Sequence, residues 1–244
     1  MKKYCSVGLT AIFFLILIAA PAFSQSSQEL WEKMIDAQGG RKTLEAIKDT
    51  TIQGSMETIQ YGMKGTMTMY QKEPNRMRMD MEIMGMTISQ GYDGEKAWMV
   101  NPQTGAVEEL PERAAQETKK QALGNDSILN PEKYGIKYEA KGKEKIQDKD
   151  YFVLEQSFED GTKATIYLDP QTYLVYKTKM KSFDFQTGAE VMVDTLFEDY
   201  QKLEGITAAH AMTIMHDGAE FLKMTFSKIA YNTNLDEAKF KMAK

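Results

Sequence analysis

Methionine and charged residues alternate in the segment RMRMDMEI at positions 76–83. Successive side chains of a β-strand point to opposite faces, so this alternation predicts a strand with one apolar face and one charged face. The apolar face carries Met77, Met79, Met81 and Ile83, and the charged face carries Arg76, Arg78, Asp80 and Glu82. We therefore expect the charged face to contact water and the methionine face to be dry.

From Thr50 onward the chain consists of short alternating runs that end at turn residues. These turns include Pro74-Asn75, Asp93-Gly94, Asp160-Gly161 and Asp217-Gly218. The spacing is typical of an antiparallel meander of about ten strands. An open twisted sheet of that size curls, so we expect a mainly β fold whose sheet has a concave face.

Two stretches of the chain have a helical period instead. In SQELWEKMIDAQGG, Ser27 is the expected N-cap and Gly39-Gly40 the expected C-cap, and a second short helix is expected over about Arg41 to Lys48. The stretch PERAAQETKKQALG, residues 111–124, combines an early proline and acid with late lysines and a final glycine, which predicts a helix from Pro111 to Leu123. Amphipathic helices need an apolar partner, and the concave face of the sheet offers one.

The first 24 residues have the composition of a signal peptide. A basic start precedes an apolar run, and Ala22 and Ser24 are small residues at the positions that a signal peptidase recognises. The run is shorter than the roughly 20 residues that span a bilayer, and Cys5 precedes the run instead of ending it, which argues against a lipid anchor. We expect cleavage after Ser24 and a periplasmic protein with one domain over residues 25–244.

Composition narrows the classes of partner. Cys5 is the only cysteine, so the exported chain has no disulfide and depends on its core for stability. The formal net charge is −5 at pH 7, and both signs are mixed along the chain. Because no basic patch occurs, the sequence argues against nucleic-acid binding and against electrostatic attraction to an anionic membrane surface.

Residues that would carry catalysis or hold a metal are scarce. The two histidines, His210 and His216, have no cysteine and no set of carboxylates at ligand spacing around them. No serine lies in a nucleophile elbow, and neither a phosphate loop nor a dinucleotide-binding motif occurs. The acidic pair Glu198-Asp199 is of the kind that usually lies on a solvated surface. We therefore expect no metal, no cofactor and no enzymatic activity.

The methionines are then the main functional signal. By strand parity, Met67 and Met69 share a face of one strand, and Met86 and Ile88 share a face of another, on either side of the 76–83 strand. Neighbouring strands would place these side chains next to one another. Unbranched thioether side chains adapt to varied shapes, which suits either an irregular core or a surface for apolar ligands. In a curved sheet, one surface can serve as both.

Four motifs resemble the LolA-like outer-membrane lipoprotein-sorting superfamily in order and spacing, over most of residues 50–244. The motifs are EPNRMRMDM (73–81), YDGEKAWMVNPQTG (92–105), YLDPQTYLVYK (167–177) and NLDEAKFKMAK (234–244). The resemblance implies an incomplete antiparallel β-barrel, closed by a helical lid over an apolar cavity that shields acyl chains. The candidate cavity residues are Met67, Met69, Met77, Met79, Met81, Ile83, Met86, Ile88 and, from the second motif, Trp98.

The resemblance implies a periplasmic carrier or binder of lipids or lipoprotein acyl chains, with a membrane protein or an acceptor lipoprotein as a further partner. A related branch of the superfamily senses lipids or lipoproteins and acts through a protein partner, so a regulatory sensor is the alternative. One position departs from the pattern: the carrier has an arginine before the proline that corresponds to Pro74, and this chain has Glu73. A carboxylate cannot donate hydrogen bonds to carbonyls, so we expect the lid to close differently or more loosely, and lipoprotein transfer to be impaired.

Overall fold

The computed structural model describes residues 25–183 and 188–242. Its α-helices are α1 (Ser27–Gln38), α2 (Arg41–Glu45), α3 (Glu112–Gln121) and α4 (Asn125–Leu129), and two 3-10 helices are η1 (Pro131–Tyr134) and η2 (Glu237–Lys239). The strands are β1 (Asp49–Thr58), β2 (Met63–Lys72), β3 (Arg76–Ile83), β4 (Met86–Tyr92), β5 (Ala97–Val100), β6 (Val107–Glu109), β7 (Lys137–Ile146), β8 (Lys149–Ser157), β9 (Lys163–Leu168), β10 (Val175–Phe183), β11 (Glu190–Leu203), β12 (Ile206–His216) and β13 (Ala219–Tyr231). The described residues thus form a mainly β protein with a few short helices.

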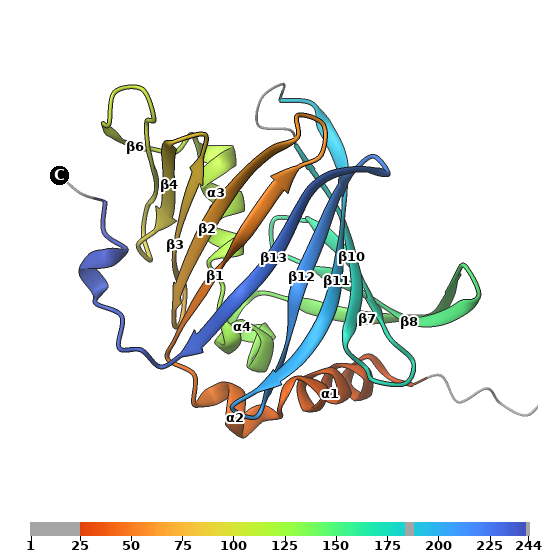
Figure 1. Cartoon of the computed structure of the whole chain (residues 1–244). Helices are drawn as coiled ribbons and strands as arrows, with labels where there is room; N and C mark the ends of the chain where they lie inside the picture. Colours follow the sequence, from red (N-terminus) through yellow and green to blue (C-terminus); the bar gives the residue numbers. More distant parts are fainter. Residues whose placement is uncertain (1–24, 184–187, 243–244) are drawn as a thin grey trace, which may run out of the picture.

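All thirteen strands of the described residues belong to one sheet, in the order β6-β5-β4-β3-β2-β1-β13-β12-β11-β10-β9-β8-β7. Every pair is antiparallel, and β1 pairs with β13, so the first and last strands meet inside the sheet. Figure 1 shows the sheet curved into an incomplete barrel whose edges are β6 and β7. The expected antiparallel half-barrel is confirmed, with thirteen strands instead of about ten. Strands such as β5 and β6, of four and three residues, are too short to produce a clear alternation.

Helix boundaries follow the capping signals with small differences. The N-cap of α1 is Ser26, one residue before the predicted Ser27, and its hydroxyl accepts a hydrogen bond from the backbone N–H of Glu29. The helix ends at Gly39, where φ is 132° and an added Cβ would lie 2.5 Å from the carbonyl oxygen of Gly205, so only glycine fits. Helix α3 begins at Glu112, one residue after the predicted start at Pro111, and ends at Gln121, two residues before the predicted Leu123. Helix α2 is also shorter than predicted.

Three of the helices cover one end of the concave face. Figure 1 shows α1 and α2 beneath the end of the half-barrel and α4 on its concave side. Their apolar residues pack with strands β8, β9 and β12 in a cluster that we call the helix-covered core: Leu30, Trp31, Met34, Ile35, Leu44, Ile47, Leu129, Leu154, Ile166, Leu168 and Ile206. Helix α3 contacts β4 and β5 separately, and Ala115 and Ala122 pack with Met77 and Tyr92 there.

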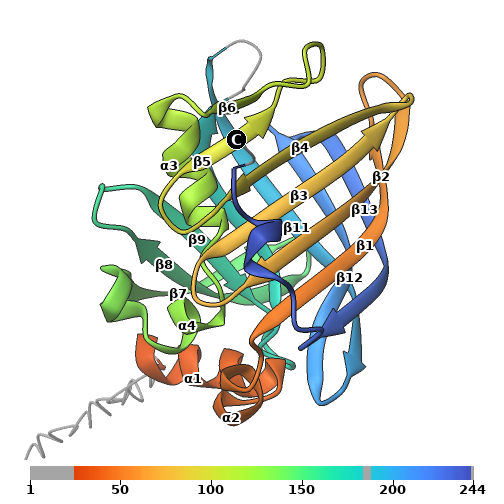
Figure 2. The same cartoon turned by 90° about the vertical axis from the view of Figure 1, so that its left-hand side faces the viewer.

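The C-terminal segment, residues 232–242, crosses the convex face of the first strands, as Figure 2 shows. It is held by the Arg78 guanidinium, which donates to the carbonyl oxygen of Lys239 over 3.2 Å, and by an ion pair between Arg76 and Glu237. The expectation that the whole charged face of β3 contacts water is therefore wrong. Glu82 is exposed, but Arg76 and Arg78 are half-buried because this distant segment folds over them.

The signal peptide predicted over residues 1–24 lies outside the described residues. Among the residues that the structure describes, no helix is long and apolar enough to cross a bilayer.

Candidate functional site: an apolar cavity under a helical lid

A cavity of about 450 Å³ lies between the concave face of the sheet and helices α1, α2 and α4. The helices contribute Trp31, Met34, Gln38, Leu44, Asn125, Ser127 and Ile128. The strands contribute, among others, Ile52, Met69, Ile166, Val175, Phe197, Met212, Phe226 and Ile229. The volume lies within the range of about 300–1,000 Å³ that is usual for small-molecule sites.

Among the described residues, no lysine, arginine, histidine, aspartate or glutamate lines this cavity. Its polar groups are hydroxyls and amides, and several already have partners: Tyr200 donates to the carbonyl oxygen of Val175 over 2.6 Å, and Gln156 donates to the Tyr138 hydroxyl over 3.1 Å. Burial raises the pKa of both Tyr138 and Tyr200 well above the ordinary value, so both hydroxyls stay protonated at neutral pH. The cavity therefore offers an uncharged environment.

A second apolar cluster continues from the cavity along the sheet. It contains no helix residue, and we call it the methionine surface: Ile52, Met56, Met67, Met69, Met79, Met81, Ile83, Ala208, Met212, Leu222, Met224, Phe226, Ile229 and Tyr231. Met69, Met212 and Phe226 belong both to this surface and to the cavity lining. Cavity and methionine surface are thus parts of one apolar tract on the concave face.

The strand register brings the predicted methionines together. Met67 lies opposite Met81 and Met69 opposite Met79 between β2 and β3. Between β3 and β4, Met81 lies opposite Ile88 and Ile83 opposite Met86. The shared face is the one that the alternation predicts. Of the nine candidate residues, Met69 alone lines the cavity itself.

Two of the candidate methionines differ from the others in their surroundings or their burial. Met77 is 2% exposed and packs under α3 with Tyr92 and Ala122, so its surroundings are core. Met86 is 53% exposed at the start of β4. A role of these methionines in ligand contact stays a prediction.

Trp98 lies on the opposite, convex face, so its placement in the cavity is wrong. It pairs with Gly91 on β4, its indole N–H donates to the carbonyl oxygen of Phe240 over 2.8 Å, and the Arg78 guanidinium lies over its ring. An added Cβ at Gly91 would lie 2.7 Å from the ring. The glycine inside a strand was the available sequence signal, because such a glycine often marks the close approach of another group.

Helix α4 is bound at its N-terminal end by the turn between β2 and β3. The Glu73 carboxylate accepts hydrogen bonds from the backbone N–H groups of Asn125, over 2.7 Å, and Asp126, over 3.3 Å. The backbone N–H of Gly124 also donates to the carbonyl oxygen of Pro74 over 3.1 Å. Glu73 therefore does fasten the lid, as an acceptor at the positive end of a helix, where the arginine of the resembled carrier would be a donor.

Burial raises the pKa of the Glu73 carboxyl, and the two backbone N–H donors oppose this shift without cancelling it. Asp126 raises the pKa of Glu73 further, whereas Lys48 lowers it. The ammonium of Lys48 does not donate to Glu73 but to the carbonyl oxygen of Glu45, over 2.8 Å. The Glu73 carboxylate thus gains two backbone N–H donors at the lid but loses part of its hydration.

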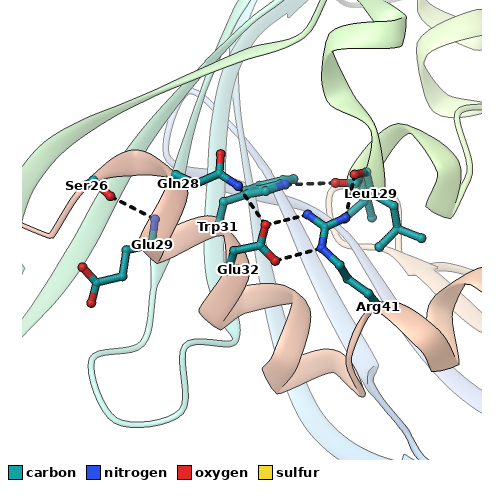
Figure 3. Close-up of polar contacts among 8 residues, drawn as sticks. Ser26, Gln28, Glu29, Trp31, Glu32, Arg41 and Leu129 are labelled. Carbon is teal, nitrogen blue, oxygen red and sulfur yellow. Dashed lines mark hydrogen bonds and ion pairs between the residues drawn. The ribbon is translucent and has the colours of Figure 1, made fainter.

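The C-terminal end of α4 is bound by donors from α1 and α2, drawn in Figure 3. The Arg41 guanidinium donates to the carbonyl oxygen of Leu129 over 2.8 Å and makes two hydrogen bonds to the Glu32 carboxylate. The Trp31 indole N–H donates to the carbonyl oxygen of Ile128 over 2.9 Å. An arginine does therefore fasten this lid. It is Arg41, which the sequence showed only as the first residue of a short helix.

The remaining sequence candidates do not form a site of their own. His210 Nδ1 lies 3.1 Å from the carbonyl oxygen of Ala208, and His216 stacks on Phe221. Glu198 accepts a hydrogen bond from the Thr213 hydroxyl over 3.2 Å. No group of three or more His, Cys, Asp or Glu side chains in the described ranges could hold a metal ion.

No protein-family model matches the sequence, and no curated protein matches it. Solved structures do match the fold. An outer membrane lipoprotein-sorting protein domain from Vibrio parahaemolyticus is 18% identical, with a TM-score of 0.59 over 88% of this chain and 97% of that one. A LolA superfamily protein from Nitrosomonas europaea is 13% identical, with a TM-score of 0.59 over 89% of this chain and 98% of that one. A DUF1329 family protein from Desulfovibrio piger is 13% identical, with a TM-score of 0.61 over 88% and 97%. The chain has the LolA-like fold.

Proposed function

We propose that this protein binds hydrophobic ligands in the periplasm, with lipid or lipoprotein acyl chains as the ligand class, in the context of outer-membrane lipoprotein sorting. The observation that carries the proposal is the uncharged cavity of about 450 Å³ under the helical lid, continuous with the methionine surface. An ionised group transferred into such a cavity would lose hydration without gaining a partner, whereas an acyl chain loses only contact with water.

Two further features support this proposal. The methionine surface adapts to chains of different shape, because thioether side chains have several rotatable bonds and no branch at Cβ. The cover of the cavity includes α4, which is fastened at both ends by hydrogen bonds to other elements. The fold neighbours include a lipoprotein-sorting domain, which favours the same ligand class.

A fluorescence titration with an apolar naphthylamine probe tests the proposal. Protein purified from the periplasmic fraction and stripped of lipid should bind the probe, and Met69→Asp should abolish binding, because the carboxylate would lie in the uncharged lining. The matched control is Thr66→Asp, on an exposed position of the same strand with the opposite parity. Absence of probe binding by the wild type, or equal binding by both variants, would refute the proposal. Mass spectrometry of the lipid extract would identify the natural ligand.

We also propose that this chain binds lipid but does not replace the housekeeping lipoprotein carrier. Its lid contact at Glu73 has the opposite polarity from the arginine of the resembled carrier, so the balance between open and closed lids should differ. The test is release of lipoproteins from loaded membrane vesicles with this protein in place of the carrier. Efficient extraction followed by transfer to an outer-membrane acceptor would contradict the hypothesis. The sensor alternative stays a prediction, which a stable complex with a protein partner would favour.

The proposed export has a separate test. The mature protein should begin at Gln25 and carry no lipid, because the small residues Ala22 and Ser24 follow the apolar run. An intact mass of the exported protein decides this. An acylated Cys5 or a retained Met1 would contradict it.

A further inference from the structure

Exposed apolar side chains gather at one end of the half-barrel. Among the described residues, the exposed large hydrophobic side chains are Ile59 (37%), Tyr61 (54%), Met84 (75%), Met86 (53%) and Leu203 (39%). The first three lie on two turns, between β1 and β2 and between β3 and β4, and Met86 is the first residue of β4 after the second turn. The register places the two turns at the same end of adjacent strands, because Thr58 pairs with Met63 and Ile83 pairs with both Gly65 and Met86.

These two turns, residues 58–63 and 83–87, are here called the hairpin tips. Their sequences are TIQYGM and IMGMT, without a single charged residue, although 27% of the chain is charged. The first tip is flanked by Glu57 and Lys64, which pair with each other over 3.7 Å, and the second tip is preceded by the exposed Glu82. Figure 1 shows the tips at the end of the sheet that lies away from α1 and α2. A solvated hairpin usually ends in polar turn residues, so the tips depart from that pattern together.

Met84 is also unfavourable for the turn that it occupies. Its φ is 53° and that of Gly85 is 78°, so both central residues are left-handed, as a two-residue hairpin turn requires. Asparagine followed by glycine is the favoured pair there, and a long side chain is disfavoured at the first position. The chain thus presents a methionine at the most exposed apolar position of the tips, against the local backbone preference.

We propose that the hairpin tips insert into the surface of a lipid bilayer and so bring the open end of the methionine surface to the membrane. Ile83, in the second tip, belongs to the methionine surface, so the apolar tract runs from the cavity to the tips without a charged residue. Isolated apolar and aromatic side chains on loops enter the boundary between headgroups and acyl chains. The proposal rests on the proposed function, because it locates at the hairpin tips the place where lipid would pass between the membrane and the cavity. Its test, however, needs no ligand in the cavity.

A second copy of this chain fits the tips less well than a bilayer. A stable protein interface buries about 1,200 Å² or more, whereas two narrow turns with four exposed apolar side chains offer much less. A bilayer needs no matching surface. Because the tips carry no basic residue, the binding should not depend on anionic lipid, so phosphatidylcholine vesicles are the appropriate probe.

Co-sedimentation of the periplasmic protein with phosphatidylcholine vesicles tests the proposal, at low salt and at high salt. The wild type should partition to the vesicles equally at both, and Met84→Asn with Met86→Thr should weaken partition by about tenfold or more, because apolar area that enters the membrane is lost. Met84→Asn favours the turn, so the fold should be retained or stabilised. The matched control is Leu203→Asn, at the turn between β11 and β12, beside Gly205 that contacts the end of α1.

A second measurement reports insertion directly. A tryptophan introduced by Met84→Trp should be quenched by brominated phosphatidylcholine more strongly than one introduced by Leu203→Trp, against the background of Trp31 and Trp98. Equal partition of the wild type and the double variant, or equal quenching at positions 84 and 203, would overturn the proposal. Self-association without vesicles that is lost in Met84→Asn would assign the tips to a second copy of the chain and overturn it as well. A wild-type protein that binds vesicles through the tips but does not bind the naphthylamine probe would refute the proposed function and leave the membrane proposal standing.

Discussion

The helix-covered core and the methionine surface both lie on the concave face, but they bury apolar side chains in different ways. In the helix-covered core, α1 inserts Leu30 and Ile35 against the sheet, and these side chains are 1% and 0% exposed. In the methionine surface the partners are strands of the same curved sheet, and most side chains, including Met79 and Met81, remain partly exposed. Two layers bury the side chains of the helix-covered core almost fully, although the cavity lies beside them, whereas one curved layer leaves the methionine surface partly exposed.

This difference explains the choice of residue types. Branched and aromatic side chains dominate the region that is packed on both sides, since fixed shapes interlock well. Methionine dominates where strand neighbours must fill space across a curved face without a covering helix. A ligand that replaced the missing second layer would complete the packing of the methionine surface. The cavity under the lid and the methionine surface beside it are therefore the parts of the concave face whose packing a ligand would complete.

The largest expected difference is in stability. Ile35→Ala should lower the free energy of unfolding by about 2–5 kcal/mol, because the surrounding two-layer packing cannot collapse around the cavity that it leaves. Met81→Ala should cost less than about 2 kcal/mol, since part of that side chain is already in contact with water. Urea denaturation of both variants measures the difference. Equal losses would show that the methionine surface is ordinary core.

Much of this comparison was visible in the sequence. The period-two pattern gave the correct shared face for Met67, Met69, Met79 and Met81, because burial on one face fixes strand register. The capping residues placed α1 and α3 to within one residue at their starts, because these caps are local signals. Strand alternation and helix caps involve residues that are close in sequence, so they can be predicted without a structure.

The features that the sequence did not show depend on distant contacts. Helix α4 has the sequence NDSIL, too short for a helical period, and it is placed by Glu73, Arg41 and Trp31 from three other elements. The face of Trp98 depends on the register of the four-residue strand β5 and on the C-terminal segment, which begins more than a hundred residues later. Long-range pairing of this kind leaves no periodic signal in the chain.

The second prediction separates the convex face from the concave one. Trp98→Phe should lower the free energy of unfolding by about 1–3 kcal/mol, because the buried carbonyl oxygen of Phe240 loses its donor. Binding of the naphthylamine probe should be unchanged, since Trp98 lies on the other side of the sheet from the cavity. Trp31 lines the cavity, so energy transfer between tryptophan and bound probe should persist in this variant. Loss of probe affinity at unchanged fold would place Trp98 at the ligand.

The third prediction addresses adaptability. Replacing Met67, Met69, Met79 and Met81 together by leucine conserves apolar character, so the free energy of unfolding should change by less than about 1.5 kcal/mol per site. The branched side chains fix the shape of the surface, so affinity for bulky probes should fall more than affinity for linear acyl chains. Titration with a linear and a branched probe measures the ratio. An unchanged ratio would show that methionine contributes apolar area but no adaptability.

The smallest expected effect concerns Glu73, which joins the strand of the methionine surface to the lid over the helix-covered core. Burial raises its pKa above the ordinary value of 4.5, so the folded state binds this proton more tightly than the unfolded state. The resulting stabilisation is present below pH 4.5 and is lost as the pH rises from there through the raised folded pKa.

Glutamine at position 73 does not titrate. The melting temperature of Glu73→Gln relative to the wild type should therefore increase between pH 4.5 and neutrality, whatever constant offset the lost acceptor adds. Glu82→Gln, an exposed position on β3, controls for removal of one carboxylate. A relative melting temperature that falls with rising pH would mean that the N–H groups of α4 stabilise the ionised carboxylate more than burial opposes it.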